Sequence, residues 1–149
     1  MLTNEQKEKI ISLARSLEGR PYIYGTSPEK APNEFDCSSF TQYLYKQIGI
    51  ALPRSTILQA GDEKGEKIYP ENGKNLPFEI GDLLFMRSNQ GYYNDSLFPG
   101  HELYIGHVVL FLGNDEVIHA KQSVGKVTTQ KLSELTTSPG YAINLIKRY

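Results

Sequence analysis

The sequence predicts an α+β domain in which N-terminal helices pack on an antiparallel sheet of about five strands. Before residue 61, apolar residues recur mainly at helical spacing, whereas beyond Ile80 short apolar runs typical of strands predominate. Connections such as residues 113–115 are short, which favours antiparallel hairpins. No internal repeat or low-complexity segment is present. We therefore expect residues 1–149 to form a single domain.

A first amphipathic helix is predicted over residues 4–18. Thr3 followed by Gln6 is a capping-box pattern, which satisfies backbone amides at a helix N-terminus. Apolar residues then recur at helical spacing, namely Ile10, Leu13, Ala14 and Leu17. Gly19 follows, as is common just beyond a helix C-terminus.

A second helix is predicted to begin at Cys37, after a loop over residues 20–36. Prolines and a glycine interrupt regular structure in that loop, namely Pro21, Gly25, Pro28 and Pro32. One helix face is then formed by residues at helical spacing, namely Cys37, Phe40, Thr41, Leu44 and Ile48. Asp36 or a neighbouring serine can cap its start, and Gly49 can end it. A short helix over residues 56–60 and a polar loop over residues 61–75 are expected next.

The second half of the chain is predicted to consist of strands. Their expected ranges are residues 82–87, 107–112, 116–120, 126–130 and 142–148. Between the first two lies the segment 88–106, which is too irregular for a strand and long for a hairpin loop. It is therefore a candidate lid or wall of a functional site.

Composition excludes several classes of function. The net charge is −1, with 16 basic and 17 acidic side chains spread along the chain. No basic stripe is present, so nucleic acid is not an expected partner. The longest apolar run, residues 108–112, is far shorter than the ~20 residues that span a bilayer. The N-terminus has no signal-peptide pattern, which fits either a cytoplasmic start or a fragment whose leader was removed.

The single cysteine, Cys37, is the first candidate for chemistry. Without a second cysteine it cannot form an intramolecular disulfide, so it is a buried thiol, an intermolecular link or a reactive group. Its predicted place in the first turn of a helix favours reactivity, because partial positive charge there stabilises a thiolate. Polar neighbours, Asp36, Ser38 and Ser39, also distinguish it from an ordinary core cysteine, which remains the alternative.

Two histidines are candidates for the base that such a thiol needs. His107 opens one predicted strand and His119 lies on the next. If the connecting loop comprises residues 113–115, Val109 pairs with His119 and His107 becomes its diagonal neighbour on the same face. The two rings could then hydrogen-bond, with His119 orienting His107. A two-residue loop would place the histidines on opposite faces, and either histidine could instead be a structural group.

A zinc site is the competing chemical interpretation. His101 and Glu102 begin like the zinc motif H-E-x-x-H, but Ile105 stands where the second histidine is required. We therefore expect no metal and no other cofactor.

Taken together, the motifs resemble the NlpC/P60 family of papain-like cysteine peptidases across roughly residues 5–146. The resemblance rests on six segments in matching order: residues 21–28 (PYIYGTSP), 35–40 (FDCSSF), 49–55 (GIALPRS) with Gln59, 81–85 (GDLLF), 106–109 (GHVV) and 118–120 (IHA). It implies a papain-like fold with the cysteine at a helix N-terminus, packed on a sheet that supplies the histidines. It further implies hydrolysis of bacterial peptidoglycan stem peptides, commonly between D-glutamate and a diamino acid, through a thioester acyl-enzyme.

The resemblance also implies roles for individual residues. Cys37 would be the nucleophile, His107 the general base and acid, and His119 the polar third member of the triad. Tyr22 matches the family tyrosine that lies close to the thiol. Asp36 matches a position that in some members contacts the substrate peptide, and Ser38 matches another.

Further candidates for substrate binding come from the segments that flank the cysteine. Tyr24 could line the groove. The stretch from Asp82 to His107 looks longer than is common in the family, so His101, Tyr104 and the pair 92–93 (YY) are candidates for a substrate-shaping loop. Two departures thicken the expected groove wall: Ser39 replaces a glycine usual in the family, and Thr26 replaces the second glycine of a common pair.

The expected protein is thus a monomeric, metal-independent thiol hydrolase whose partners are peptidoglycan peptides. It would act at the cell wall or in the periplasm if the family assignment holds. Two alternatives remain open. One is a catalytically silent module that binds wall peptides or a protein, and the other is a thiol amidase or acyltransferase with a non-wall substrate.

Overall fold

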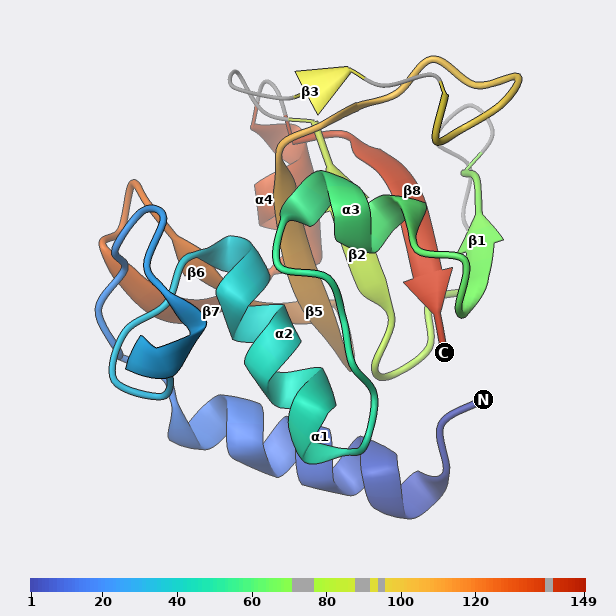
Figure 1. The fold of residues 1–149 in the computed structure, drawn as a ribbon. Coiled ribbons are helices and arrows are strands. Elements are labelled where there is room, and N and C mark those ends of the chain that lie inside the picture. Colours follow the sequence, from blue (N-terminus) through green and yellow to red (C-terminus); the bar gives the residue numbers. More distant parts are fainter. Residues whose placement is uncertain (71–76, 88–91, 94–95, 139–140) are drawn as a thin grey trace.

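Two helices, α1 (Asn4–Ser16) and α2 (Cys37–Gln47), lie on one face of an antiparallel sheet (Figure 1). The computed structural model describes residues 1–70, 77–87, 92–93, 96–138 and 141–149. A third, short helix, α3 (Thr56–Gly61), stands beside the N-terminal end of α2 (Figure 1). The α+β class and the papain-like arrangement of helices on a sheet are confirmed.

The helix boundaries follow from their caps. In α1, Thr3 and Gln6 form the predicted reciprocal capping box, and the helix buries Ile10 and Ala14. In α2, the Asp36 side chain accepts a hydrogen bond from the backbone amide of Ser39. Each helix therefore begins where the sequence predicts, at a residue whose side chain satisfies an otherwise unpaired amide.

The main sheet has six strands in the order β1-β8-β2-β5-β6-β7, and every pairing is antiparallel. The strands are β1 (Glu66–Ile68), β2 (Leu83–Met86), β5 (His107–Gly113), β6 (Glu116–Lys121), β7 (Lys126–Lys131) and β8 (Ile143–Arg148). A separate pair, β3 (Tyr92–Tyr93) with β4 (Tyr104–Ile105), lies at one end of the molecule (Figure 1). All five predicted strands are present, and no bound differs from the prediction by more than one residue.

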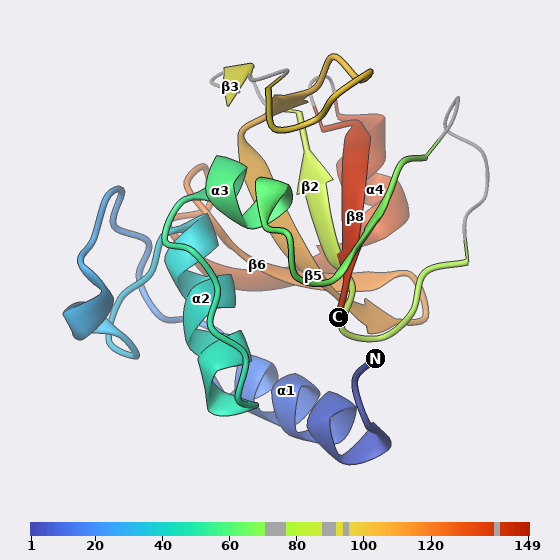
Figure 2. The same cartoon turned by 45° about the vertical axis from the view of Figure 1, so that its right-hand side comes forward.

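Both faces of the sheet are buried. The helix-side core includes Phe40 and Leu44 of α2 packed with Val108 and Leu110 of β5. On the opposite face, a second cluster is covered by α4 (Leu132–Thr137) (Figure 2). Strand β5 is apolar at consecutive positions, a pattern typical of a strand buried on both faces.

Elements that the sequence did not predict lack local signals. Helix α4 has no side-chain N-cap, and β1 lies inside the predicted loop 61–75, of which residues 71–75 are outside the described part. Strand β1 pairs with the C-terminal strand β8, far away in the sequence. The buried ammonium of Lys147 in β8 stabilises this edge by donating hydrogen bonds to the backbone carbonyls of Asp62, Lys64 and Gly65.

Residues 96–105 are anchored to the core through Phe98 and Ile105. Phe98 is fully buried, and Leu97 packs so closely on Gly61 of α3 that a Cβ there would lie 3.1 Å from its Cδ1 atom. Residues 96–105 therefore form a wall beside α3. The remaining residues, 88–91 and 94–95, lie outside the described part, so the lid interpretation stays a prediction.

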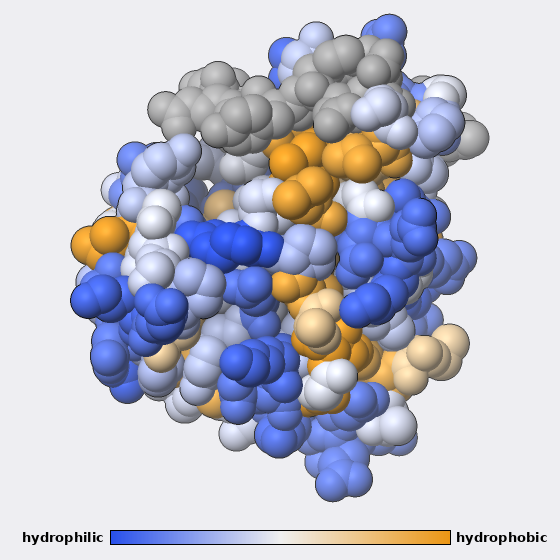
Figure 3. All heavy atoms as spheres, viewed as in Figure 1, coloured by the Kyte–Doolittle hydropathy of each residue, from blue (hydrophilic) through white to orange (hydrophobic). Residues whose placement is uncertain are grey.

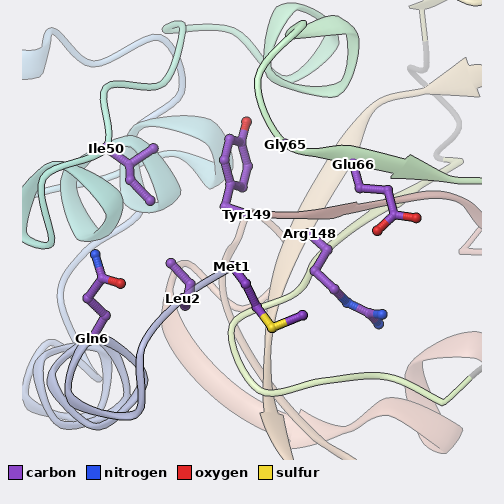
Figure 4. Close-up of a pocket in the computed structure, with 8 residues that line it drawn as sticks. All are labelled: Met1, Leu2, Gln6, Ile50, Gly65, Glu66, Arg148 and Tyr149. Atoms are coloured by element: carbon purple, nitrogen blue, oxygen red, sulfur yellow. The ribbon is translucent and has the colours of Figure 1, made fainter.

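The two ends of the described chain meet at the edge of the sheet. The Leu2 amide donates to the Tyr149 carbonyl at 2.8 Å. A cavity of about 530 Å³ opens here between α1, the end of β8 and Ile50, which follows the C-terminus of α2 (Figure 4). It lies at the opposite end of α2 from Cys37.

Within the described residues, no helix combines the length and apolar character needed to cross a bilayer.

Candidate active site

Cys37 is the first residue of α2, and its side chain is 8% exposed. The Asp36 side chain accepts from the Ser39 amide, while the Ser38 amide in the same helix turn acts as a hydrogen-bond donor to the Cys37 sulfur. The Cys37 Sγ atom lies 3.4 Å from the Thr56 Oγ1 atom, at the first residue of α3. The thiol thus sits where two helix N-termini meet, in surroundings that can stabilise negative charge.

The histidine pair depends on the register of the β5–β6 hairpin. Leu110 pairs with Ile118, which places Val109 opposite His119 and His107 diagonally across from it, as predicted. The turn itself has two residues, Asn114 and Asp115, both with positive φ, so the predicted three-residue loop is wrong.

A β-bulge reconciles the two-residue turn with the predicted register. At the hairpin end Gly113 pairs with Glu116, whereas beyond the irregularity Phe111 pairs with Val117. One extra residue, Leu112, is therefore accommodated in β5, and the pairing shifts by one position. Without this shift the two histidines would lie on opposite faces of the sheet.

The two imidazoles are directly hydrogen-bonded. His107 Nε2 lies 2.7 Å from His119 Nδ1, and the ring planes are inclined by 65°. Within the described residues, His107 Nδ1 has no hydrogen-bond partner and Cys37 Sγ is not hydrogen-bonded to the His107 ring. The backbone amide of Val108, the residue after His107, acts on the Cys37 sulfur as a hydrogen-bond donor and so works to lower its pKa.

Electrostatics hold both reactive groups in their neutral forms. Burial raises the pKa of the Cys37 thiol, against the lowering effect of the Thr56 hydroxyl. Burial also holds the pKa of His107 well below its usual value, and the positive charge of Lys121 acts in the same direction. For His119, burial lowers the pKa to about 4. The site therefore contains a neutral thiol and a neutral imidazole, so an attack by the sulfur would require transfer of the thiol proton.

Acidification is expected to destabilise the fold, because both buried histidines must then accept protons. An unfolded histidine has a pKa of 6.5, whereas that of folded His119 is about 4 and that of His107 is also lowered. Between these values the unfolded chain binds more protons, so the free energy of unfolding falls as pH falls. Through His119 the free energy of unfolding is about 3 kcal/mol larger above pH 6.5 than below pH 4. This difference is lost progressively as the pH falls from 6.5 through 4.

Urea denaturation between pH 7 and pH 4.5, followed by circular dichroism, measures this dependence. The transition midpoint is expected to fall over that range, and less steeply in a His119→Gln variant. Identical slopes in the two proteins would contradict the assignment to His119.

Tyr22 lies near the thiol, whereas Tyr24 is on the surface. Burial raises the pKa of Tyr22, and negative charge on Cys37 would act in the same direction. The Tyr24 side chain is 68% exposed. Both belong to the loop before α2, which is attached to the fold where Tyr22 forms a bridge with Phe35.

Asp36 and Ser38, the predicted substrate contacts, are held by Arg54. The Arg54 guanidinium donates to Asp36 Oδ2 at 2.7 Å and to Ser38 Oγ at 2.9 Å. It also donates to the Thr26 carbonyl at 2.6 Å, joining the α2–α3 connection to the loop before α2. Although burial acts to raise the Asp36 pKa, Arg54 and the Ser39 amide lower it overall. Asp36 is therefore ionised, and its oxygens are largely occupied by the protein itself.

His101 and Tyr104 lie on the wall formed by residues 96–105. The His101 ring stacks on Tyr69, with centroids 3.6 Å apart and planes inclined by 3°, and so does not join the histidine pair. The Tyr104 ring is covered on one side by Arg87 and remains 45% exposed. In the view of Figure 3, apolar side chains gather over α3 and its surroundings, bordered by hydrophilic residues.

Three neighbours of the site were not singled out from the sequence: Arg54, Thr56 and Gln130. Arg54 lies in segment 49–55, one of the six segments that carry the family resemblance, so the sequence did contain a signal for this residue. Gln130 Oε1 lies 2.9 Å from His119 Nε2, but only the β6–β7 register brings them together.

The described residues contain no group of three or more histidine, cysteine or acidic side chains arranged to hold a metal ion.

An α+β fold with a thiol at a helix N-terminus and a hydrogen-bonded histidine pair on the adjoining sheet defines a papain-like thiol hydrolase class. Within that class, the chain belongs to the NlpC/P60 family, whose model matches residues 19–144. The chain is similar to the peptidoglycan endopeptidase RipB of Mycobacterium tuberculosis, with 28% identity over 144 residues that cover 89% of this chain and 50% of RipB.

Two other relatives agree with the family assignment. A gamma-D-glutamyl-L-lysine dipeptidyl-peptidase of Bacillus cereus is 29% identical over 135 residues, covering 90% of this chain and 33% of that protein. The crystal structure of the NlpC/p60 domain of the peptidoglycan hydrolase SagA superposes with a TM-score of 0.66 at 28% identity, covering 96% of this chain and 98% of that domain. The chain thus spans half or less of the two curated relatives but nearly all of the isolated domain.

Proposed function

We propose that this chain is a cysteine endopeptidase that hydrolyses the bond between D-glutamate and a diamino acid in peptidoglycan stem peptides. The observation that carries the proposal is the hydrogen-bonded pair of His107 and His119 on the strands beside the helix-terminal thiol of Cys37. The names of the relatives, peptidoglycan endopeptidase and gamma-D-glutamyl-L-lysine dipeptidyl-peptidase, support the substrate class.

In the first step the Cys37 sulfur attacks the scissile carbonyl carbon while its proton passes to His107 Nδ1. The negative charge that develops on the carbonyl oxygen is stabilised by the unpaired amides at the start of α2. The C–N bond then breaks, His107 returns the proton to the leaving amine, and a thioester joins the acyl group to Cys37.

In the second step water hydrolyses the thioester. His107 accepts a proton from the water as its oxygen attacks the thioester carbonyl, and the C–S bond breaks. The acyl product leaves with a new carboxyl group, and the proton returns from His107 to the sulfur. His119 stabilises the charged imidazolium in each step by accepting a hydrogen bond from His107 Nε2.

The substrate is proposed to lie between the loop before α2 and the wall formed by residues 96–105. Tyr22 would contact the reacting end of the peptide, with Asp36, Ser38 and Tyr24 on one side. His101 and Tyr104 would contact it on the other. The Arg54 contacts of Asp36 and Ser38 support a role in shaping this side of the groove as well as in binding. The unit is proposed to act as a monomer on wall peptides, with residues 1–149 as one catalytic domain.

The test is digestion of purified peptidoglycan, followed by mass spectrometry of the released fragments. The expected products carry a new free carboxyl group on D-glutamate and a new free amine on the diamino acid. The matched control is Cys37→Ala, which removes the sulfur but keeps a small residue with high helix propensity. It is expected to release no fragments while retaining the circular dichroism spectrum of the parent protein.

Other outcomes would overturn the proposal in distinguishable ways. Binding to wall without release of fragments would indicate a silent binding module. Release that persists in Cys37→Ala would exclude the thiol as nucleophile. Absence of both binding and release, together with acyl transfer to or from other amides, would indicate a substrate outside the wall.

A further inference from the structure

We propose that Gln130 is a positioning residue that sets the tautomers of both histidines and so leaves His107 Nδ1 available as the base. This inference rests on the proposed function for its kinetic consequence, but not for its structural one. Gln130 lies on β7, and the register that pairs His119 with Thr128 puts Gln130 on the same face, diagonal to His119. Its Oε1 atom lies 2.9 Å from His119 Nε2.

The direction of each hydrogen bond follows from the chemistry of Gln130. A carboxamide oxygen can only accept, so His119 Nε2 must carry the proton in this contact. Neutral His119 then has no proton on Nδ1, which must accept the 2.7 Å hydrogen bond from His107 Nε2. Neutral His107 in turn has no proton on Nδ1. That nitrogen is consequently the one that can take the thiol proton.

Lys121 determines which way the Gln130 carboxamide faces. Its ammonium lies 3.4 Å from the same Oε1 atom, and an ammonium can only donate. If the carboxamide were reversed, its NH₂ group would face the Lys121 ammonium donor to donor, so the contact with Lys121 favours the orientation in which Oε1 faces both groups. Lys121 also lies over the Tyr141 ring, 5.3 Å from its centroid, and that ring meets His107 edge-on at 5.8 Å.

Because His119 is buried, the position of its ring proton determines where His107 can carry its own proton. His119 is fully buried and uncharged, and it therefore holds a single ring proton that must be on one nitrogen or the other. If that proton moved to Nδ1, it would oppose the proton of His107 Nε2 across 2.7 Å. His107 would then have to place its own proton on Nδ1, where it could not act as a base. A neutral acceptor at position 130 prevents this exchange without adding charge.

The test compares Gln130→Met, which keeps the length but removes the acceptor, with Gln130→Glu, which keeps an acceptor oxygen. The control is Thr128→Val on the same strand, because among the described residues the Thr128 hydroxyl donates its hydrogen bond to the Thr129 carbonyl and not to either histidine. The first readout is the tautomer of each histidine, from two-bond ¹⁵N–¹H correlation spectra of the whole chain labelled with ¹⁵N. It needs no substrate and stays valid even if the proposed hydrolysis is wrong.

In the parent protein, in Thr128→Val and in Gln130→Glu, both histidines are expected to carry their proton on Nε2. In Gln130→Met, a mixture of Nε2–H and Nδ1–H forms is expected. The kcat of stem-peptide hydrolysis should fall about 10- to 100-fold in Gln130→Met with little change in KM, and recover in Gln130→Glu. Unchanged tautomers and unchanged kcat in Gln130→Met would overturn the inference.

Discussion

Replacing His107 by either alanine or glutamine is expected to lower kcat/KM for stem-peptide hydrolysis by about a thousandfold or more. The reason is that His107 is proposed to move the proton in both halves of the reaction, and a positioned base typically contributes 10²- to 10⁴-fold. The neutral Cys37 thiol, whose pKa is raised by burial, cannot compensate by ionising on its own.

The alanine and glutamine variants together distinguish the loss of a basic nitrogen from the loss of a packed side chain. A glutamine amide can still donate a hydrogen bond to His119 Nδ1, but it has no basic nitrogen. If His107 acts as the base, both variants lose activity to a similar degree. Recovery of more than a tenth of the parent rate in His107→Gln would instead assign His107 a structural role. Initial rates on a synthetic stem peptide, with circular dichroism melting as the check on folding, provide the measurement.

Replacing Asp36 by alanine is expected to lower the free energy of unfolding by about 3 kcal/mol. The carboxylate caps α2, accepts from the Gly25 amide at 3.1 Å and pairs with Arg54 at 2.7 Å. Its loss removes a helix cap and leaves a guanidinium without its counter-ion. Because the Arg54 side chain is 31% exposed, the ion-pair part is smaller than it would be for a fully buried pair.

Asp36→Asn is the matched control, since asparagine also caps helices but carries no charge. It is expected to lose about 1 to 2 kcal/mol, mostly from the Arg54 contact. Urea denaturation followed by circular dichroism measures both variants. If Asp36→Ala loses less than about 0.5 kcal/mol while KM for the stem peptide rises sharply, Asp36 acts mainly on the substrate and its structural role is minor.

Local sequence signals account for the parts of the fold that were predicted well. The caps at Thr3 and Asp36 define where α1 and α2 begin, and a cap acts through residues only three positions away. Helix α4 lacks such a cap. Strand β1 exists only because β8, far away in the sequence, pairs with it. Neither has a strong local pattern, so neither could be predicted from local spacing.

The residues of the candidate site also divide into those with a local sequence signal and those without one. Cys37 was identified from its polar neighbours at a helix start, and the histidines from the period-two geometry of a hairpin. The contact between Gln130 and His119 depends on the register of a third strand, which nothing in the sequence of β7 specifies. The Arg54 contacts require the α2–α3 connection to fold back over the start of α2. Contacts of this kind appear only once the elements are assembled.

The bulge at Leu112 has a consequence for how this hairpin tolerates changes in length. His107 and His119 are twelve positions apart, and their shared face results from that even spacing combined with one extra residue in β5. Removing the bulge without deleting a residue, while the turn stays at two residues, would shift the pairing by one position and reverse the side of the sheet on which one imidazole lies, whereas deleting Leu112 would keep Phe111 opposite Val117 and both imidazoles on one face. A three-residue turn without the bulge would keep both in place. Natural variation and loop grafting at this tip are therefore constrained by the pairing of Phe111 with Val117, which must be preserved whatever the number of residues between them.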